Sequence, residues 1–231
     1  MHPLDNPIWM ALTTTQVNFA ETCRLARRFQ PEVTLLGAFE QPSRPAYESL
    51  ACLQKGPEPT ALFLLDAPDL PTGWSILETV PLLQMVCEKF IRPSATAESC
   101  ELTEADVPQM LKLVELTKPG PFGRRTREMG TYLGIRQQGR LAAMAGERMK
   151  LPGYTEVSAV CTHPDFLGRG FAAALMTELI DKVIARNGVP FLHVRERNER
   201  AVALYRRMGF RERMTFHLAV VHKPQTATRA A

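Results

Sequence analysis

The chain has 231 residues, of which 45% are hydrophobic and 23% charged, so it can bury a core of normal size without disulfide or metal support. Its net charge of +4 is too small to indicate nucleic-acid binding, which needs basic residues clustered on one face. Five scattered cysteines without a C-x-x-C pair indicate reduced thiols, and no apolar run approaches the roughly 20 residues of a membrane span. We expect a cytoplasmic protein with no metal ion, nucleic-acid partner or membrane partner.

Residues 1–98 are predicted to form an N-terminal α/β region of short, mixed elements. Proline separates the connections, and residues 92–97 are the best candidate for a linker. The pattern predicts helices over 15–29 and 47–54, and strands over 33–36, 61–65 and 86–91.

Residues 99–231 have a clearer pattern. Thr103 is an expected helix N-cap, because an acidic residue follows at the third helical position. Asn187-Gly188 is typical of a left-handed helix C-terminus. The expected elements are a helix ending before Pro119, strands over 131–136, 141–149 and 155–162, a helix from 171, a strand over 189–194, a helix over 198–208 and a strand over 211–221. This order, α-β-β-β-α-β-α-β, indicates a mixed α/β fold.

A glycine turn joins the third of these strands directly to a helix. It reads Leu167-Gly168-Arg169-Gly170-Phe171-Ala172. Glycine lets a ligand approach the backbone closely, and the first N–H groups of a helix have no internal partners and carry a partial positive charge. The turn therefore favours a phosphate group, although two glycines alone are equally compatible with a tight turn that binds nothing.

Two spaced motifs resemble the GNAT superfamily of N-acetyltransferases. The run from Val160 to Ala172 resembles its acyl-CoA motif, except that Leu167 stands where the family has Gln or Arg. The second motif follows one helix and one strand later and comprises Asn198, Ala201, Leu204, Tyr205, Gly209 and Phe210. The resemblance covers about residues 100–222. It implies a GNAT-like fold with a central mixed, mostly antiparallel sheet flanked by helices.

The resemblance also implies which residues bind acetyl-CoA. These are Val160, Cys161, Thr162, Leu167, Gly168, Arg169, Gly170, Phe171, Ala172, Asn198, Ala201 and Tyr205. Asn198 is equally suited to capping its helix, and Tyr205 to the core. In the family, the strand at Cys161 contributes backbone, so the thiol is interpreted as a small hydrophobic group and not as a nucleophile.

The resemblance gives the catalytic roles as well. The Tyr205 hydroxyl would protonate the departing CoA thiolate, and Glu147 or Glu156 would act as the general base, each being equally interpretable as a solvated charge at a strand end. His193 is expected as a satisfied polar group of the core. The basic loop 118–127 would border the acceptor pocket, or simply be solvated.

The sequence thus predicts an N-acetyltransferase that moves an acetyl group from acetyl-CoA to a primary amine by direct transfer, with no metal. The acceptor would be a small molecule or a peptide, and the protein a monomer or homodimer. A non-catalytic acyl-CoA sensor with the same fold is the alternative. The region 1–98 would be a degenerate half-copy of this fold, a dimerisation element or a lid over the acceptor pocket.

Overall fold

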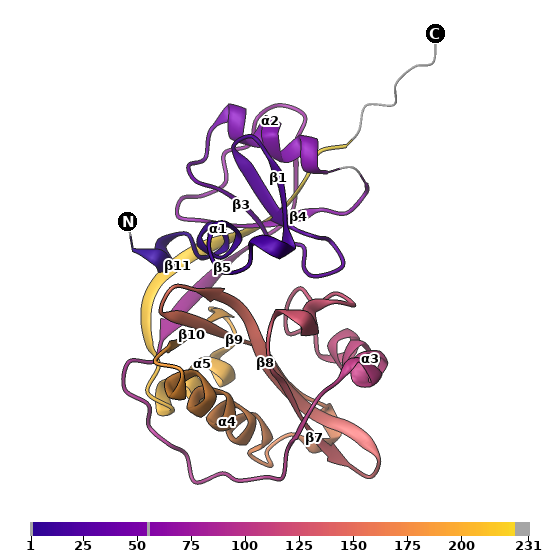
Figure 1. Ribbon diagram of the computed structural model, residues 1–231, viewed down its shortest axis with the longest axis vertical. Helices are drawn as coiled ribbons and strands as arrows, with labels where there is room; N and C mark the ends of the chain where they lie inside the picture. Colours follow the sequence, from indigo (N-terminus) through magenta and orange to yellow (C-terminus); the bar gives the residue numbers. More distant parts are fainter. Residues whose placement is uncertain (1, 55, 225–231) are drawn as a thin grey trace.

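The computed structural model describes residues 2–54 and 56–224. Its longer helices are α1 (Pro7–Thr13), α2 (Arg44–Leu53), α3 (Val107–Thr117), α4 (Phe171–Ala185) and α5 (Glu199–Arg207). Its strands are β1 (Ala20–Cys23), β2 (Ala26–Phe29), β3 (Gly37–Phe39), β4 (Thr60–Leu64), β5 (Ser75–Val86), β6 (Cys100–Glu101), β7 (Tyr132–Gln137), β8 (Arg140–Leu151), β9 (Tyr154–Thr162), β10 (Val189–Arg195) and β11 (Arg211–His222). The chain therefore has the mixed α/β fold expected from the sequence (Figure 1).

Eight strands form one mixed sheet in the order β4-β11-β5-β10-β9-β8-β7-β6. Its one parallel pair is β9 with β10 in the described part of the chain, and every other neighbouring pair is antiparallel. Strands β4 and β5 precede residue 98 and yet lie in this sheet, with β5 between β10 and β11. The sheet thus runs across the boundary predicted at residue 98, which stays a prediction.

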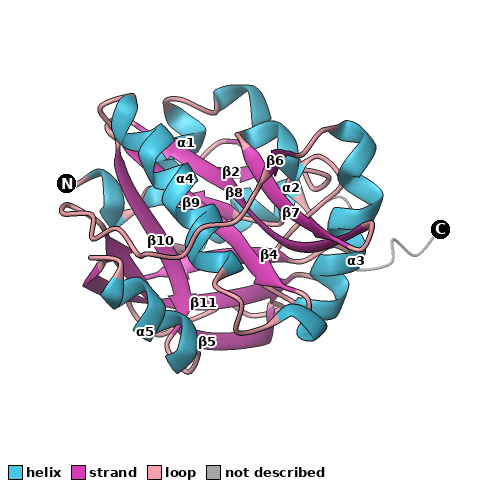
Figure 2. Cartoon of the chain, turned by 90° about the horizontal axis from the view of Figure 1, so that it is seen from below, coloured by secondary structure: helices cyan, strands magenta, loops and turns pink. Residues whose placement is uncertain are grey.

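Helices cover the two faces of the sheet. Helix α4 lies across β8, β9 and β10 (Figure 2), and its Leu175, Leu179 and Val183 are fully buried there. Helices α1 and α3 pack on the opposite face, where Ile8 and Leu12 of α1 join the core. Helices α1 and α3 therefore cover one face, while α4 and α5 cover the other.

Local signals fix several helix ends. Thr103 and Asp106 form a capping box ahead of α3. Beyond α4, Asn187 is left-handed with φ of 57°, and the Gly188 N–H donates to the Val183 carbonyl at 3.0 Å. Both predictions are confirmed, because the backbone groups left over at each end find the partners that the sequence offers.

The helix predicted over residues 15–29 is wrong. The segment forms a short 3-10 turn at Val17–Phe19 and then the hairpin of β1 and β2, with Arg24 at φ of 45° in the turn. Strand β5 was also misplaced, since it runs over 75–86 and not 86–91. Its first half is solvent-exposed, with Ile76 at 44% and Leu77 at 59%, so it lacks the buried run that marks a central strand.

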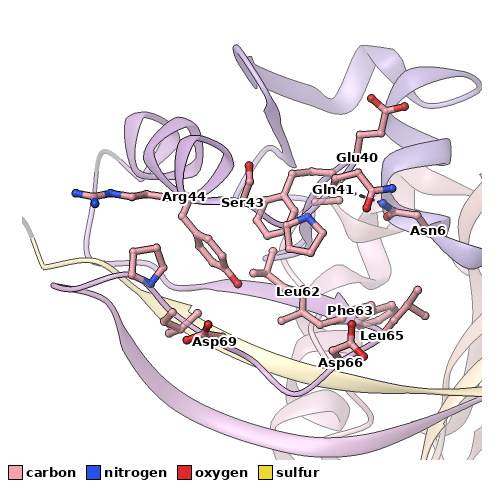
Figure 3. A pocket seen from close by; sticks show the side chains of 18 of the residues that line it. Asn6, Glu40, Gln41, Ser43, Arg44, Leu62, Phe63, Leu65, Asp66 and Asp69 are labelled. Carbon is pink, nitrogen blue, oxygen red and sulfur yellow. Dashed lines mark hydrogen bonds between the residues drawn. The ribbon is translucent and has the colours of Figure 1, made fainter.

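The three-stranded sheet β1-β2-β3 meets the large sheet at one point. Leu36 bridges to Ala61 of β4 in parallel orientation. Beyond this bridge a cavity of about 730 Å³ lies between β3, the start of α2, and β4 with the loop that follows it (Figure 3). Among the helices of residues 2–54 and 56–224, none is long and apolar enough to cross a membrane.

Candidate active site

Strands β9 and β10 pair at one end and then separate. Their parallel register covers only Tyr154–Glu156 with Val189–Phe191, although β9 continues to Thr162 and β10 to Arg195. The His163 N–H donates to the Ala142 carbonyl of β8 at 2.8 Å. Because N–H groups alternate in direction along a strand, those of Thr162 and Val160 face the opening toward β10. The sheet thus offers unpaired backbone donors at this divergence.

A bulge lies in β9 beside the opening. The pairing with β8 shifts between Met144/Cys161 and Gly146/Ser158, so β9 has one more residue than its partner. Ala159 lies in this bulge with φ of 52°, an uncommon conformation for a residue with a Cβ. Such bulges re-aim backbone groups and recur next to functional sites.

The glycine turn precedes α4 in the conformation that its glycines permit. Gly168 and Gly170 have φ of 79° and 76°, and no side chain caps the helix, whose N-cap is Gly170. The space where a Gly168 side chain would stand is open to 4 Å. Uncapped N–H groups of Phe171 and Ala172, in the first turn of a 15-residue helix, suit an anion.

The side chains around the turn add positive charge. Arg169 and Arg140 stack on the two sides of Phe166, with guanidinium-to-ring distances of 5.1 and 5.3 Å. Arg140 also pairs with Asp165 at 3.3 Å. Leu167 is 49% exposed, so the position that departs from the family pattern contributes no polar contact. The residues present fit the phosphates of CoA through backbone N–H groups and the Arg169 charge.

Tyr205 lies on α5, in the core cluster under α4. Burial raises the pKa of its hydroxyl, and the nearby Cys161 thiol of β9 adds to this effect. Burial also raises the pKa of Cys161 to about 11, which keeps the thiol protonated and supports its interpretation as a hydrophobic group. Tyr205 and Cys161 therefore lie near each other at the divergence, both in their neutral forms.

Asn198 caps α5. Its side-chain oxygen accepts from the Ala201 N–H at 3.3 Å, which is the structural role considered for it. Helix α5 thereby begins directly after β10 and presents Ala201 and Tyr205 from the same face.

Glu147 and Glu156 lie on opposite faces of the sheet. Glu147 of β8 is fully buried on the α4 face, where it pairs with Arg186 beyond α4 and with Lys150 at 2.9 Å. Burial raises the pKa of Glu147, but the hydrogen bonds and charges of these two cations outweigh it and hold the pKa below its ordinary value. Glu147 is thus held in ion pairs away from the acceptor side.

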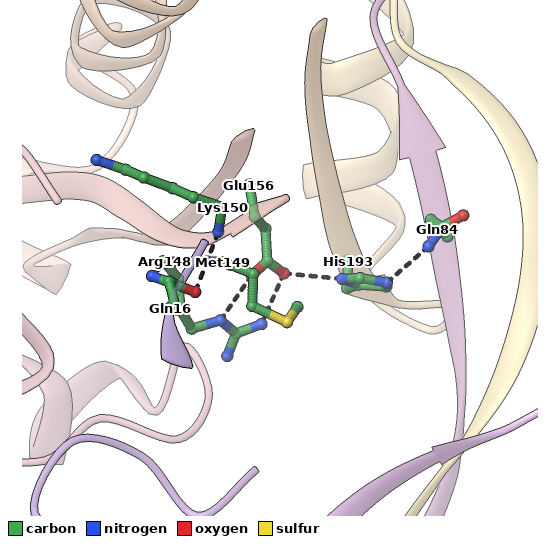
Figure 4. Close-up of polar contacts among 7 residues, drawn as sticks. All are labelled: Gln16, Gln84, Arg148, Met149, Lys150, Glu156 and His193. Carbon is green, nitrogen blue, oxygen red and sulfur yellow. Dashed lines mark hydrogen bonds and ion pairs between the residues drawn. The ribbon is translucent and has the colours of Figure 1, made fainter. Parts of the chain in front are cut away.

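Glu156 of β9 faces the N-terminal region, at the last paired position before the divergence. Arg148 of β8 donates to both of its oxygens, at 2.7 and 2.8 Å, and the His193 Nδ1 lies 2.7 Å from Oε1 (Figure 4). Burial raises the pKa of Glu156, but the Arg148 charge and these hydrogen bonds prevail and lower it to about 2. Glu156 is a fixed carboxylate at neutral pH.

The hydrogen bonds continue from Glu156 across β10 to β5. The Gln84 amide is oriented by its other partners, since its Oε1 accepts from Arg213 at 3.0 Å and its Nε2 donates to the Leu4 carbonyl at 3.0 Å. The Gln84 Nε2 therefore also donates to the His193 Nε2, 3.1 Å away, and the His193 Nδ1 carries the proton given to Glu156. Burial lowers the pKa of His193, so the ring is neutral and satisfied, as predicted.

Tyr132 is a residue that the sequence analysis missed. Its ring crosses Gly146 of β8, where an added Cβ would lie 2.2 Å from the ring. Its fully buried hydroxyl has no hydrogen-bond partner within the described ranges, and it lines a crevice too narrow to hold a water molecule, together with Arg148, Ser158, Ala159 and loop residues 119–122. Buried unpaired polar groups are rare and require an explanation. The glycine inside a strand at 146 was the available signal.

The structure thus brings most predicted residues together and separates one. The glycine turn, the end of β9 and Tyr205 surround the divergence from the α4 side, and Glu156 lies at its start on the other side. Glu147 lies apart. Among the described residues, no cluster of His, Cys, Asp and Glu is arranged to hold a metal ion.

Comparisons with known proteins concern the family and the fold. A family model described as FR47-like protein matches residues 132–218. The crystal structure of an acetyltransferase from the GNAT family of Novosphingobium aromaticivorans is 36% identical, with a TM-score of 0.89, and the match covers 97% of this chain and 100% of that one. A GCN5-related N-acetyltransferase from Kribbella flavida, 16% identical over 93% of this chain and 95% of its own, shares the fold with a TM-score of 0.64.

Curated relatives match over shorter stretches. The N-alpha-acetyltransferase RimI of Mycobacterium tuberculosis is 38% identical over 99 residues, which are 40% of this chain and 61% of the relative. An uncharacterized protein of Mycobacterium leprae is 31% identical over 182 residues, 67% of this chain and 50% of that protein. The chain thus spans between half and two thirds of the length of these relatives.

Proposed function

The chain belongs to the GNAT family of acetyltransferases, and from this membership we propose that it transfers an acetyl group from acetyl-CoA to a primary amine by direct attack. The observation that carries the proposal is the separation of β9 from β10 beyond Glu156, directly in front of the glycine turn. It leaves backbone N–H groups and a helix N-terminus available to one elongated anionic thioester.

Each end of the substrate has a matching set of groups in this chain. The phosphates would meet the N–H groups of the glycine turn and the Arg169 charge. The thioester carbonyl would accept from a β9 N–H, that of Val160 or Thr162, which stabilises the negative charge that develops on its oxygen. The remaining predicted contacts, from Asn198 and Ala201, lie at the start of α5.

The reaction then needs one bond made and one broken. The amine nitrogen attacks the thioester carbon, the new C–N bond forms, and the C–S bond breaks with its electron pair going to sulfur. The Tyr205 hydroxyl, neutral because burial raises its pKa, gives its proton to that sulfur. The acceptor ammonium group loses one proton to water before attack, because only the neutral amine has a free lone pair. After attack the nitrogen loses a second proton, which returns through water to the Tyr205 oxygen, so that Tyr205 ends the cycle neutral.

The assignment of the general base to Glu147 or Glu156 stays a prediction, and the geometry favours Glu156. Only Glu156 lies on the face covered by the N-terminal region, at the start of the divergence. With a pKa of about 2, Glu156 is a weak proton acceptor. We therefore propose an electrostatic role for it, in which its charge attracts the ammonium group of the acceptor and holds His193 in place, while water accepts the proton. The Tyr132 hydroxyl, which has no partner among the described residues, is the group that we expect to hydrogen-bond the acceptor.

A matched pair of glycine variants tests the donor. Gly168 and Gly153 have φ of 79° and 78°, and both face open space, so Gly168→Val and Gly153→Val carry the same backbone strain. Gly153 lies at the far end of β9, roughly 30 Å away at 3.3 Å per residue. Calorimetry with CoA should show binding to the wild type and to Gly153→Val, and at least tenfold weaker binding to Gly168→Val. Equal binding by the two variants would refute the proposal.

Turnover tests the chemistry. Because the relative RimI is named an N-alpha-acetyltransferase, peptides with free N-terminal amines are the first acceptors to screen, followed by small amines. For an active acceptor, Tyr205→Phe should lower kcat by about 10²-fold or more while the Kd for CoA stays within twofold. A Tyr205→Phe enzyme with unchanged kcat would remove Tyr205 from the mechanism.

A further inference from the structure

The N-terminal region repeats the topology of residues 99–231, which contain the proposed acyl-transfer site. Strands β1, β2 and β3 are antiparallel neighbours, α2 follows, and β4 then meets β3 in parallel. Strands β7, β8 and β9, helix α4 and strand β10 follow the same order. Each half ends in a 12-residue strand, β5 or β11, which pairs with the other half: β5 with β10, and β11 with β4. This arrangement supports the half-copy interpretation of residues 1–98.

The repeat has its own strand divergence. Strands β3 and β4 are joined at Leu36 and Ala61, where the Ala61 N–H donates to the Leu35 carbonyl at 2.8 Å. Beyond this point they separate, and the cavity of about 730 Å³ opens between them, in front of α2. We call it the N-terminal cleft. Its place relative to β3, α2 and β4 matches that of the acyl-CoA opening relative to β9, α4 and β10.

The chemistry of the N-terminal cleft does not suit CoA. The turn before α2 reads Glu40-Gln41-Pro42-Ser43 and contains no glycine. Ser43 already caps the helix, because its hydroxyl accepts from the Ala46 N–H at 3.3 Å. The one arginine of the cleft, Arg44, is paired with Glu48 at 3.5 Å. Among the described residues of the cleft, a pyrophosphate would therefore find a capped helix without a glycine turn and no unpaired arginine.

Negative charge and an apolar wall characterise the N-terminal cleft instead. The carboxylates of Asp66 and Asp69 have no ion pair within residues 2–54 and 56–224. Figure 3 shows Asp66 beside Phe63 and Leu65, and Asp69 apart from it, across the cleft from Ser43 and Arg44. A ligand that is cationic at one end and apolar at the other would complement both features.

The buried side chain of Tyr47 provides an independent indication of a ligand. Tyr47 of α2 lines the cleft and is only 3% exposed, held between the rings of Phe39 and Trp74 at 5.0 and 5.5 Å. Its hydroxyl has no hydrogen-bond partner in the part of the chain that the structure describes. Burial raises its pKa, and the Asp69 charge adds to this. Tyr47 and Asp69 both line the cleft, and the negative charge of Asp69 acts on the Tyr47 hydroxyl.

We propose that the N-terminal cleft binds a small amphipathic organic cation, a primary ammonium group on an alkyl or aryl body, at a site separate from that of acyl-CoA. The ammonium group donates to the Asp69 carboxylate and to the Tyr47 oxygen, and Asp66 adds negative charge to the cleft. The apolar body lies against Leu62 and Phe63. The site is independent of the proposed acetyl transfer, because it uses none of the residues of the β9–β10 opening.

Titration of the full chain with 2-phenylethylamine tests the proposal, with 3-phenylpropionate as the anionic analogue of similar shape. Calorimetry measures binding, and the fluorescence of Trp74, next to Tyr47, provides a second signal. We expect the amine to bind and the carboxylate to show at least tenfold weaker binding. Asp66→Asn with Asp69→Asn should weaken amine binding at least tenfold, and Tyr47→Phe about threefold.

A charge-matched control separates this site from general attraction. Glu101→Gln with Glu115→Gln removes two exposed carboxylates from the other half and should leave amine binding unchanged. Equal weakening in the control pair, or equal binding of the two analogues, would overturn the proposal. So would competition by CoA, or loss of amine binding in Gly168→Val, since either would place the amine in the acyl-CoA site. The proposed transfer can fail its own test without affecting these results.

Discussion

Replacing Glu156 by glutamine tests the buried polar chain most directly. The variant keeps the shape of the side chain and one acceptor oxygen, which can still accept from the His193 Nδ1. The amide nitrogen then faces the Arg148 guanidinium, which has donors only. Arg148, with its side chain 7% exposed, loses the charge that balances it.

The magnitude follows from two separate arguments. Breaking a buried ion pair from one side costs about 3–5 kcal/mol, because an uncompensated charge remains. The lowering of the Glu156 pKa from 4.5 to about 2 corresponds to about 3 kcal/mol at 1.36 kcal/mol per unit. A lowered carboxylate pKa stabilises the folded state above the unfolded pKa, so this contribution is complete above about pH 4.5 and is lost as the pH falls toward 2.

Urea denaturation at a series of pH values measures this effect. At pH 7 we expect Glu156→Gln to lower the free energy of unfolding by about 3 kcal/mol or more. Adding Arg148→Met should restore part of the loss, because the second change removes the unpaired charge. Glu212→Gln is the control: its exposed pair with Arg206 should contribute less than about 1 kcal/mol.

The result that refutes the reasoning is a Glu156→Gln protein within about 1 kcal/mol of the wild type. A double variant less stable than Glu156→Gln alone would also contradict it, because the loss would then come from packing. The wild type should further lose stability more steeply than Glu156→Gln between about pH 4.5 and 2.

Three further outcomes follow from the site. Tyr132→Phe should leave CoA binding unchanged and the free energy of unfolding within about 1 kcal/mol of the wild type, because the hydroxyl has no partner to lose. The kcat/KM for the acceptor should fall severalfold, and an unchanged kcat/KM would leave the hydroxyl without a role. Gly146→Ala should destabilise the fold by about 1–3 kcal/mol in urea denaturation, since the new Cβ meets the Tyr132 ring at 2.2 Å; a loss below about 0.5 kcal/mol would show that the ring can move. Asn198→Ala should cost about 1 kcal/mol through the lost cap of α5, and full wild-type stability would mean that water replaces the cap.

Much of the second half could be predicted because its signals are local. The capping box at Thr103 and the left-handed Asn187 need only the residues around them. The glycine turn likewise fixes where β9 ends and α4 begins. Each of these predictions uses a stretch of about ten residues or fewer, and the structure confirms them.

The contacts of the site residues could not be predicted, because they depend on pairing between segments that are far apart in the sequence. Glu147 and Glu156 look alike in the sequence, but the shift in pairing between β8 and β9 decides which face each occupies. Gln84 meets His193 only because β5 enters the sheet 109 positions away in sequence. The apolar stripe over 15–29 satisfied a helical pattern, while pairing with β3 decided in favour of a hairpin. Tertiary pairing overrides local propensity in such segments.

The exchange of β5 and β11 between the two halves has a consequence for folding. Strand β5 has neighbours only on β10 and β11, which follow it by more than 100 residues. During synthesis the N-terminal half therefore emerges with β5 lacking both neighbours and β4 lacking β11, and exposed strand edges favour aggregation. Contacts of such long sequence separation also slow folding. We infer that neither half acquires its native sheet until β11 has left the ribosome, so the two halves fold as one cooperative unit.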